Sequence, residues 1–299
     1  MKKLLIGLIA VVILGVAAYF LFSYFTSSLV ETTEDTPFAP EVTQQEGEDQ
    51  TNEPRTVIGS SAEGREIVAH HYGSGDTRLL FVGGIHGGYS WNTSLVAYEL
   101  MEHLEQNPSV IPQNVSVTVI PVLNPDGLFE VVGTTERFTR ADVPSSEAAT
   151  VPGRYNGNGV DLNRNFDCDW QSTGVWQNTE VDGGSAAFSE PESRAVRDFI
   201  AAEDPAAVVI WYSAAGGVFA SNCHNDILPE TRDAMNTFAQ ASGYKAFENY
   251  NFYEITGDMA NWLAKERVPA ISVLLTTHTD TEWSKNRAGV EALLQSYAN

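Results

Sequence analysis

The sequence predicts an α/β domain, with a largely parallel sheet and helices on both of its faces, behind an N-terminal transmembrane helix. Two observations support this prediction. From residue 56 onward, short apolar runs rich in β-formers alternate with segments of helical period. Such alternation is typical of parallel sheets flanked by helices. Ahead of this region, residues 4–25 form an uncharged and mostly apolar run.

The apolar run is long enough to be a membrane anchor. It follows Lys2 and Lys3, and no acid appears before Glu31. As a helix, such a run spans the roughly 30 Å hydrocarbon core of a bilayer. We therefore assign residues 1–26 to an anchor, and the lysines are expected to keep the N-terminus cytoplasmic and the remaining chain extracytoplasmic. The small residues at 15–18 leave a cleaved signal peptide open as an alternative.

An acidic linker follows the anchor. Residues 26–54 contain eight acids and no Lys or Arg, which cannot support a packed core. We assign residues 27–55 to this linker and residues 56–299 to one folded domain. The formal net charge of the chain is −22 at pH 7, which argues against nucleic acid as a partner because phosphate binding requires basic patches.

Within the domain, five apolar runs are predicted strands, and several are nearly continuous, as in strands buried on both faces. The predicted strands are residues 66–71, 78–82, 116–122, 207–212 and 270–275. The predicted helices are residues 93–105, 190–202, 229–242, 258–265 and 286–297. A long stretch from residue 127 to about 187 is predicted to be irregular, and such loops are usually functional.

Four residues stand at the carboxyl ends of predicted strands, namely His86, Asn124, Tyr212 and Leu274. In open α/β sheets, binding sites form in the crevice beyond these ends. We therefore expect one shared site there.

Two cysteines, Cys168 and Cys223, leave two possibilities open: a disulfide, which an extracytoplasmic location permits, or two free buried thiols. Their spacing does not favour a zinc knuckle.

Six sequence segments, in this order, resemble the zinc metallocarboxypeptidase family, in particular its bacterial branch that acts on cell-wall peptides. They are Gly-Gly-Ile-His-Gly at 83–87, Asn-Pro-Asp-Gly at 124–127, Arg-Tyr-Asn at 154–156, Gly-Val-Asp-Leu-Asn-Arg-Asn-Phe at 159–166, Phe-Ser-Glu-Pro-Glu at 188–192 and Pro-Ala-Ile-Ser-Val at 269–273. The resemblance covers residues 56–299. It implies a mixed eight-stranded sheet flanked by helices, with zinc as the cofactor.

The resemblance also implies that most of the hydrolytic residues are substituted. A hydrolytic zinc needs about three protein ligands. His86 matches the first zinc histidine, but the zinc glutamate position holds Tyr89, or Ser90 if the loop is one residue longer. The second zinc histidine is replaced by Tyr212, and the general-base glutamate by Leu274.

The residues that hold a substrate carboxylate are retained by the same comparison. Arg164 matches the bidentate carboxylate ligand, and Asn163 a second donor. Arg154 matches the arginine that polarises the scissile carbonyl, and Tyr253 the mobile tyrosine that covers the peptide. An arginine fork suits a carboxylate. The structural alternative is that both arginines pair with Asp161 or Asp167.

These observations predict a membrane-tethered, carboxypeptidase-like protein of impaired or absent activity that binds peptides through a free C-terminal carboxylate. Whether it is an enzyme stays open. The alternative is an active zinc carboxypeptidase with a rearranged metal site. That site would use His224, His278 or tyrosine phenolates as ligands. A new base would come from Glu254, Asp258, Asp280 or Glu282. A third possibility is a scaffold whose groove is unused.

Overall fold

The computed structural model describes residues 55–298. The predicted anchor, residues 1–26, and nearly all of the predicted linker lie outside the described residues. Within residues 55–298, no helix is both long enough and apolar enough to cross a membrane.

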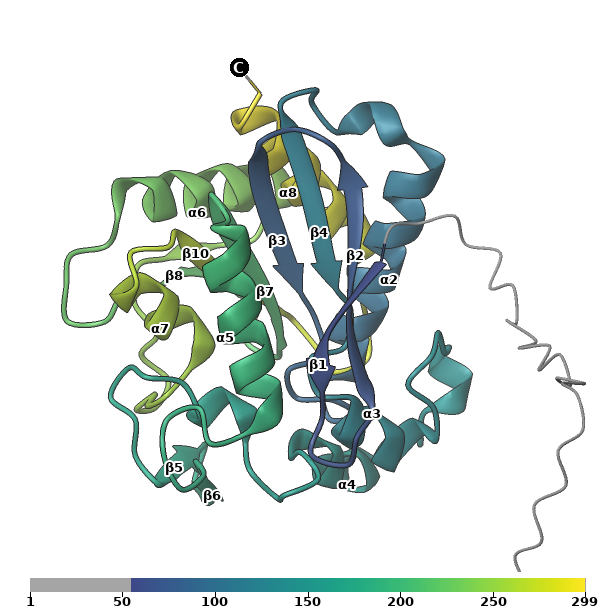
Figure 1. The fold of residues 1–299 in the computed structure, drawn as a ribbon, viewed down its shortest axis with the longest axis vertical. Coiled ribbons are helices and arrows are strands. Elements are labelled where there is room, and N and C mark those ends of the chain that lie inside the picture. The colour runs from purple at the N-terminus through teal and green to yellow at the C-terminus, as the bar shows by residue number, and fades with distance from the viewer. Residues whose placement is uncertain (1–54, 299) are drawn as a thin grey trace, which may run out of the picture. The chain divides into compact units, whose positions relative to one another are not determined.

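A single eight-stranded sheet forms the centre of the domain (Figure 1). Its strand order is β1-β2-β4-β3-β7-β10-β8-β9. The strands are β1 (Arg55–Ser60), β2 (Glu66–Gly73), β3 (Thr77–Val82), β4 (Val115–Ile120), β7 (Ala207–Ser213), β8 (Gly217–Ala220), β9 (Ala246–Phe247) and β10 (Ala270–Leu275). The four central strands from β4 to β10 are parallel, as are β8 and β9, whereas β1, β2 and β4 pair antiparallel and so do β10 and β8. The predicted mixed, largely parallel sheet is confirmed; β1, β8 and β9 were not predicted.

Helices cover both faces of the sheet, as predicted (Figure 1). One face is covered by α2 (Trp91–Gln106), α6 (Pro229–Ser242) and α8 (Trp283–Ser296). The other face is covered by α5 (Pro191–Glu203) and α7 (Met259–Lys265). The five predicted helices all exist, with ends shifted by three residues or fewer.

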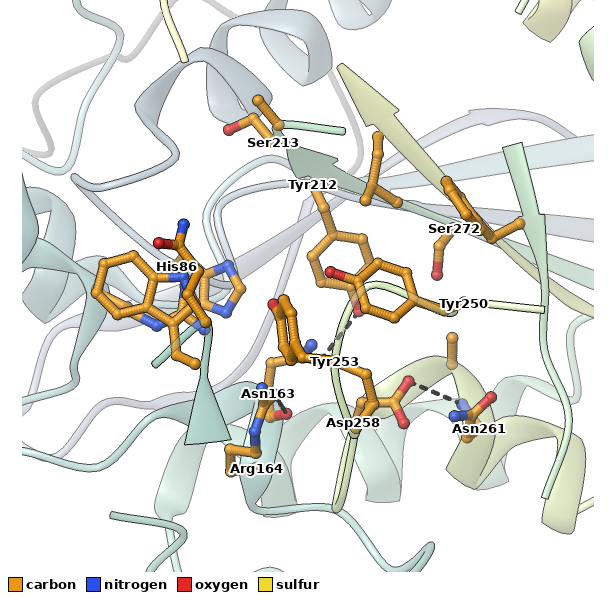
Figure 2. Close-up of a pocket in the computed structure, with 18 of the residues that line it drawn as sticks. His86, Asn163, Arg164, Tyr212, Ser213, Tyr250, Tyr253, Asp258, Asn261 and Ser272 are labelled. Carbon is orange, nitrogen blue, oxygen red and sulfur yellow. Dashed lines mark hydrogen bonds between the residues drawn. The ribbon is translucent and has the colours of Figure 1, made fainter. Parts of the chain in front are cut away.

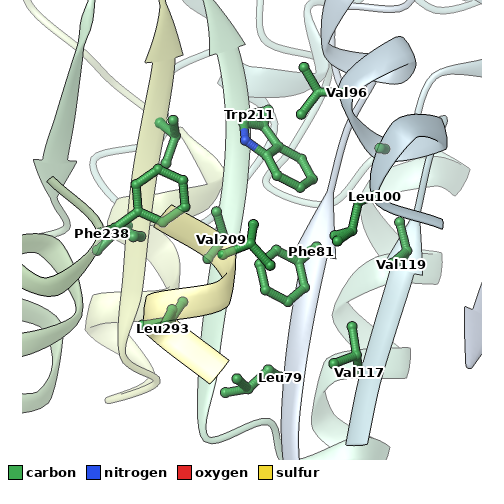
Figure 3. Close-up of a cluster of buried hydrophobic side chains, with 14 of the residues drawn as sticks. Leu79, Phe81, Val96, Leu100, Val117, Val119, Val209, Trp211, Phe238 and Leu293 are labelled. Carbon is green, nitrogen blue, oxygen red and sulfur yellow. The ribbon is translucent and has the colours of Figure 1, made fainter. Parts of the chain in front are cut away.

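Side chains of the central strands alternate between the two faces, as period-two strands require. Phe81 and Trp211 stack on the face of α2 and α8, with ring centroids 5.7 Å apart (Figure 3). Tyr212 and Leu274 belong to the opposite core, with α5 and α7. Both therefore lie at the carboxyl ends of parallel strands on the α5–α7 side.

The stretch predicted to be irregular contains regular structure. It holds most of α3 (Pro125–Val132), the short helix α4 (Glu147–Thr150) and a hairpin of β5 (Thr173–Trp176) and β6 (Thr179–Asp182). The prediction missed these elements because they are short and lack a sustained apolar period. In Figure 1 they lie beyond the carboxyl ends of β3 and β4.

A disulfide joins Cys168 to Cys223, with Cα atoms 6.1 Å apart. The structure thus decides between the two possibilities that the sequence left open. The bridge ties the loop that carries Arg164 to the segment that follows β8.

Candidate functional site

One pocket collects the predicted site residues (Figure 2). It encloses about 830 Å³, counting the part open to solvent. Of the nine residues matched to functional positions of the family, all but Ser90 line it: His86, Tyr89, Arg154, Asn163, Arg164, Tyr212, Tyr253 and Leu274.

Two residues expected near this site lie elsewhere. Ser90 is buried at the start of α2, and its Oγ has no hydrogen-bond partner among the described residues. Asn124 caps α3, because its Oδ1 accepts the N–H of Gly127 at 2.9 Å. Of the two candidate positions for the zinc glutamate, Tyr89 lines the pocket and Ser90 does not.

His86 is a buried, neutral imidazole. Its Nε2 lies 3.3 Å from Oδ1 of Asp161, and neither ring nitrogen makes a regular hydrogen bond within residues 55–298. Burial, together with the nearby Arg154 guanidinium, lowers the pKa of His86 to about 4 despite the opposing effect of Asp161. Near neutral pH the ring is uncharged, so one nitrogen is available as an acceptor.

Tyr89 is held by other side chains of the pocket. Its hydroxyl lies 3.2 Å from Nε2 of His278, and its ring meets the edge of Trp176 at a centroid distance of 4.9 Å. Nδ1 of His278 lies 3.0 Å from Oγ of Ser213. Burial raises the pKa of Tyr89 to about 12. Tyr89 is thus a neutral phenol, and both nitrogens of His278 are already engaged.

Tyr212 is likewise a neutral phenol. Its hydroxyl donates to Oδ1 of Asn163 at 3.0 Å, and burial raises its pKa well above the ordinary value. It stands beside Leu274 in the register of β7 and β10.

These donors do not fit the zinc that the resemblance implies. Among residues 55–298, no three His, Cys, Asp or Glu side chains are grouped so as to hold a metal ion. Catalytic zinc takes imidazole, thiolate or carboxylate ligands. Here His86 is accompanied by two neutral phenols. His224 does not line the pocket, and its exposed ring pairs with Asp169 at 2.6 Å.

Only one of the four candidate replacement bases lines the pocket. Glu254 and Asp280 are exposed outside it, and Glu282 accepts hydrogen bonds from Tyr244 and Thr276. Asp258 does line the pocket, where it caps α7.

Arg154 is neutralised inside the protein. Its Nε and Nη2 donate to Oδ2 of Asp161 at 2.9 and 2.6 Å, and its guanidinium lies 4.4 Å from the Trp176 ring centroid. Burial alone would raise the pKa of Asp161, but the Arg154 guanidinium holds it below the usual range. The structural alternative, pairing with Asp161, therefore holds for Arg154.

Arg164 has no such counterion. It is 1% exposed, and its Nη1 and Nη2 donate to the carbonyls of Asn163 and Val175 at 2.7 and 2.6 Å. Its Nε lacks an acceptor, and no acid within residues 55–298 forms an ion pair with it. Asp167, the other proposed partner, pairs instead with Lys265 at 2.7 Å.

Asn163 and Tyr253 complete this side of the pocket. Oδ1 of Asn163 accepts from Tyr212 and from the backbone N–H of Met259, whereas its Nδ2 has no acceptor in the described part of the chain. The Tyr253 ring is half-buried and meets the edge of Tyr250, with centroids 5.2 Å apart. Unused donors of Arg164 and Asn163 thus line the same pocket (Figure 2).

Several lining residues were not predicted from the sequence: Trp176, Ser213, Tyr250, Asn261 and Ser272. Ser213 and Tyr250 lie next to or near predicted residues in the sequence, which could have indicated them. Trp176 lies in the unpredicted β5–β6 hairpin, and no local signal marks it.

The chain is similar to known proteins in both sequence and fold. The chain is 34% identical over 154 residues to a zinc carboxypeptidase from Simulium vittatum, a match covering 48% of this chain and 47% of the relative. The chain thus spans about half the length of that curated relative.

Two solved structures share the fold at 20% sequence identity, each covering 82% of this chain. They are carboxypeptidase A from Helicoverpa armigera, with a TM-score of 0.61 over 69% of its chain, and murein-tripeptide amidase MpaA from Escherichia coli O157, with a TM-score of 0.56 over 92% of its chain. The profile described as zinc carboxypeptidase matches residues 48–290. The chain belongs to the zinc carboxypeptidase family.

Proposed function

We propose that this protein binds the C-terminal carboxylate of peptides and does not hydrolyse them. The observation that carries the proposal is Arg164, a cation that is 1% exposed, lines the pocket and has no acidic partner in residues 55–298. A buried, unpaired charge costs several kcal/mol. A ligand carboxylate would offset this cost.

The free donors suit a carboxylate. A guanidinium carries five N–H donors in a planar fork, and the two carbonyl contacts leave N–H groups of Arg164 unused. Nδ2 of Asn163 supplies a second donor from the neighbouring residue. Tyr253, at the pocket wall, would cover the bound residue.

The other side of the pocket lacks hydrolytic groups. Leu274 cannot accept a proton, and loss of a positioned general base costs about 10²–10⁴ in rate. A metal-bound water supplies several further kcal/mol of catalysis in zinc peptidases, and the donors around His86 do not fit that metal. We therefore derive no hydrolytic step.

We also propose where the protein is located in the cell. Residues 1–26 anchor it in a membrane, residues 27–55 tether the domain, and Lys2 and Lys3 keep the N-terminus cytoplasmic, so that the domain is extracytoplasmic. Stem peptides of the cell wall are the proposed ligands. The fold shared with a murein-tripeptide amidase is compatible with them.

Isothermal titration tests the proposal on the full-length protein in detergent. The ligands are N-acetyl-trialanine with a free C-terminal carboxylate and the same peptide as its C-terminal amide. The free acid is expected to bind at least tenfold more tightly than the amide. Arg164→Met should abolish that difference, since methionine keeps the volume without the charge. Arg78→Met, an exposed arginine paired with Glu203, is the matched control.

A zinc measurement distinguishes this proposal from the alternative of an active zinc carboxypeptidase. Elemental analysis after dialysis against trace zinc is expected to find far less than one ion per chain. One tightly held zinc, together with release of C-terminal alanine from the peptide, would overturn the proposal in favour of an active carboxypeptidase with a rearranged site. Equal affinity for acid and amide would favour an unused groove.

A further inference from the structure

The pocket also carries hydrogen-bond acceptors that carboxylate binding does not use. They belong to His86 and Tyr89, which line the same pocket as Arg164. Figure 2 shows His86 and Arg164 on the wall of this pocket. An ionised carboxylate offers only acceptors, so these groups cannot serve it. The direction of each hydrogen bond around them decides what they can bind.

A series of hydrogen bonds fixes where the proton of His278 lies. It starts at Asn92, whose Nδ2 donates to the backbone carbonyls of Thr277 and Asp280 at 2.7 and 2.9 Å. The amide is thereby oriented, and its Oδ1 accepts the hydroxyl of Ser213 at 3.1 Å. A serine hydroxyl has one proton, so Oγ of Ser213 can only accept from Nδ1 of His278, 3.0 Å away.

Tyr89 is the last member of this series. Burial lowers the pKa of His278 below its ordinary value of 6.5, so at about pH 8 the ring carries a single proton. With that proton on Nδ1, Nε2 of His278 is bare and accepts the Tyr89 hydroxyl at 3.2 Å. The Tyr89 oxygen therefore has lone pairs to offer a ligand, but its proton is already used.

Nδ1 of His86 is a second acceptor. The ring is neutral, and its Nε2 faces the Asp161 carboxylate at 3.3 Å. That anion attracts the single ring proton to Nε2, which leaves Nδ1 bare. Nδ1 is buried and has no hydrogen-bond partner within residues 55–298, on a residue that is 5% exposed. A buried acceptor without a donor is costly, so a donor from a ligand would stabilise it.

A ligand that suits both groups of the pocket carries a carboxylate and a hydrogen-bond donor. The Arg154 guanidinium lies 5.7 Å from the Tyr89 ring centroid, and like charges repel, so a neutral donor is favoured over an ammonium. We propose that His86 and Tyr89 bind a backbone N–H of the peptide whose carboxylate Arg164 binds. A peptide backbone supplies such a neutral donor at every residue except proline. The ligand is then recognised as a peptide and not by its carboxylate alone.

This inference rests on the proposed carboxylate binding, and an ester scan tests it separately. Full-length protein in detergent, at about pH 8, is titrated with N-acetyl-trialanine and with analogues in which lactate replaces each alanine in turn. Lactate keeps the methyl group but replaces one N–H by an ester oxygen. One of these analogues is expected to bind about tenfold more weakly than the peptide, and the others less than about threefold more weakly.

Variants assign the lost hydrogen bond to its acceptor. In the double variant His86→Leu with Tyr89→Phe, the tenfold ester penalty should fall to about threefold or less, because both acceptors are gone. The two single variants show which acceptor carries it. Tyr98→Phe is the matched control, because Tyr98 is a buried tyrosine outside the pocket whose hydroxyl donates to the carbonyl of Thr135. This control should keep the full penalty.

The outcomes separate this inference from carboxylate binding. Equal affinities of the peptide and all of its esters, or a full penalty in the double variant, would overturn the role of His86 and Tyr89. Carboxylate binding stands in that case if Arg164→Met still abolishes the preference for acid over amide. If no peptide binds, both proposals fail. Thermal unfolding shows whether the double variant is folded, and if it is not, the ester scan of the wild type decides alone.

Discussion

The two buried arginines of the pocket both carry a charge away from water, and they differ in the groups that compensate this charge. The Nε and Nη2 of Arg154 both donate hydrogen bonds to Asp161, and the Trp176 ring covers its guanidinium. Arg164 is equally buried, yet within residues 55–298 its side chain donates hydrogen bonds only to backbone carbonyls. Charges in a protein interior need an opposite charge or extensive hydrogen bonding. The first arginine therefore belongs to the fold, and the second is the one that we propose binds a ligand.

This difference changes the interpretation of the residues retained from the family. Arg154 matches the family arginine that polarises a scissile carbonyl, but here its charge is already matched by Asp161. Arg164 and Asn163 keep free donors. Retention of a residue type therefore does not imply retention of its role. The role of a residue depends on the groups that it contacts in the structure.

Replacing each buried arginine in turn should change the stability of the protein by very different amounts. Arg154→Met leaves Asp161 buried and unpaired, which should lower the free energy of unfolding by about 3–5 kcal/mol. Arg164→Met removes an unpaired charge and two hydrogen bonds, so the free energy of unfolding should change by less than about 1 kcal/mol. Urea unfolding followed by tryptophan fluorescence measures both.

The control for this pair is the double variant Arg154→Met with Asp161→Leu. It removes both charges, and much of the lost stability should return, since an ion pair replaced by apolar side chains is often neutral. Equal losses for the two single arginine variants would show that the contrast between them has no energetic basis.

His86 provides a pH-dependent test of the Arg154 side. Its folded pKa, about 4, is below the ordinary 6.5, so between these values the unfolded chain binds a proton that the folded protein excludes. Stability should therefore be complete above about pH 6.5 and fall as pH drops toward 4, by roughly 3 kcal/mol in total. Urea titrations across this range, compared with His86→Gln, isolate the contribution. If the free energy of unfolding falls equally with pH in the wild type and in His86→Gln, His86 makes no such contribution.

Much of the fold follows from the sequence because the central elements carry strong patterns. The parallel strands are apolar runs, and helices such as α6 have a clear apolar stripe. Strand β8 and the edge strand β9 have four and two residues, too few to show a period. The β5–β6 hairpin was missed for the same reason.

The candidate site was predicted only in part. The resemblance to the family singled out the eight residues that line the pocket, and the strand-end argument accounts for three of them, His86, Tyr212 and Leu274. Asp161 and Asp167 each lie three residues from Arg164 in the sequence, so the sequence alone could not decide which of them pairs with an arginine. The turn at Leu162–Arg164 directs Asp161 toward Arg154, and Asp167 pairs with Lys265. Long-range contacts of this kind carry no local signal.

Asn163, next to Arg164, offers a second test of carboxylate binding. Asn163→Asp keeps an oxygen for Tyr212 and for the N–H of Met259, but it replaces the free Nδ2 donor by a carboxylate oxygen. The new charge repels a ligand carboxylate, so affinity for N-acetyl-trialanine should fall by about 30-fold or more. Isothermal titration measures the loss. Unchanged thermal unfolding confirms that the fold is intact, and unchanged affinity would remove Asn163 from the binding site.

Replacing Tyr253, the tyrosine that we propose covers the bound peptide, should weaken binding only slightly. Tyr253 packs against Tyr250, and the two side chains share a hydrogen bond that leaves the Tyr253 hydroxyl able to donate to a ligand. If the hydroxyl contacts the bound peptide, Tyr253→Phe should weaken N-acetyl-trialanine binding about two- to fivefold, the value of one modest hydrogen bond. Tyr253→Ala should weaken it further because the ring is lost as well. The loss should be expressed as faster dissociation in surface plasmon resonance, since a cover opposes exit more than entry. A slower association rate with unchanged dissociation would instead place Tyr253 at the entrance, as a gate rather than a cover.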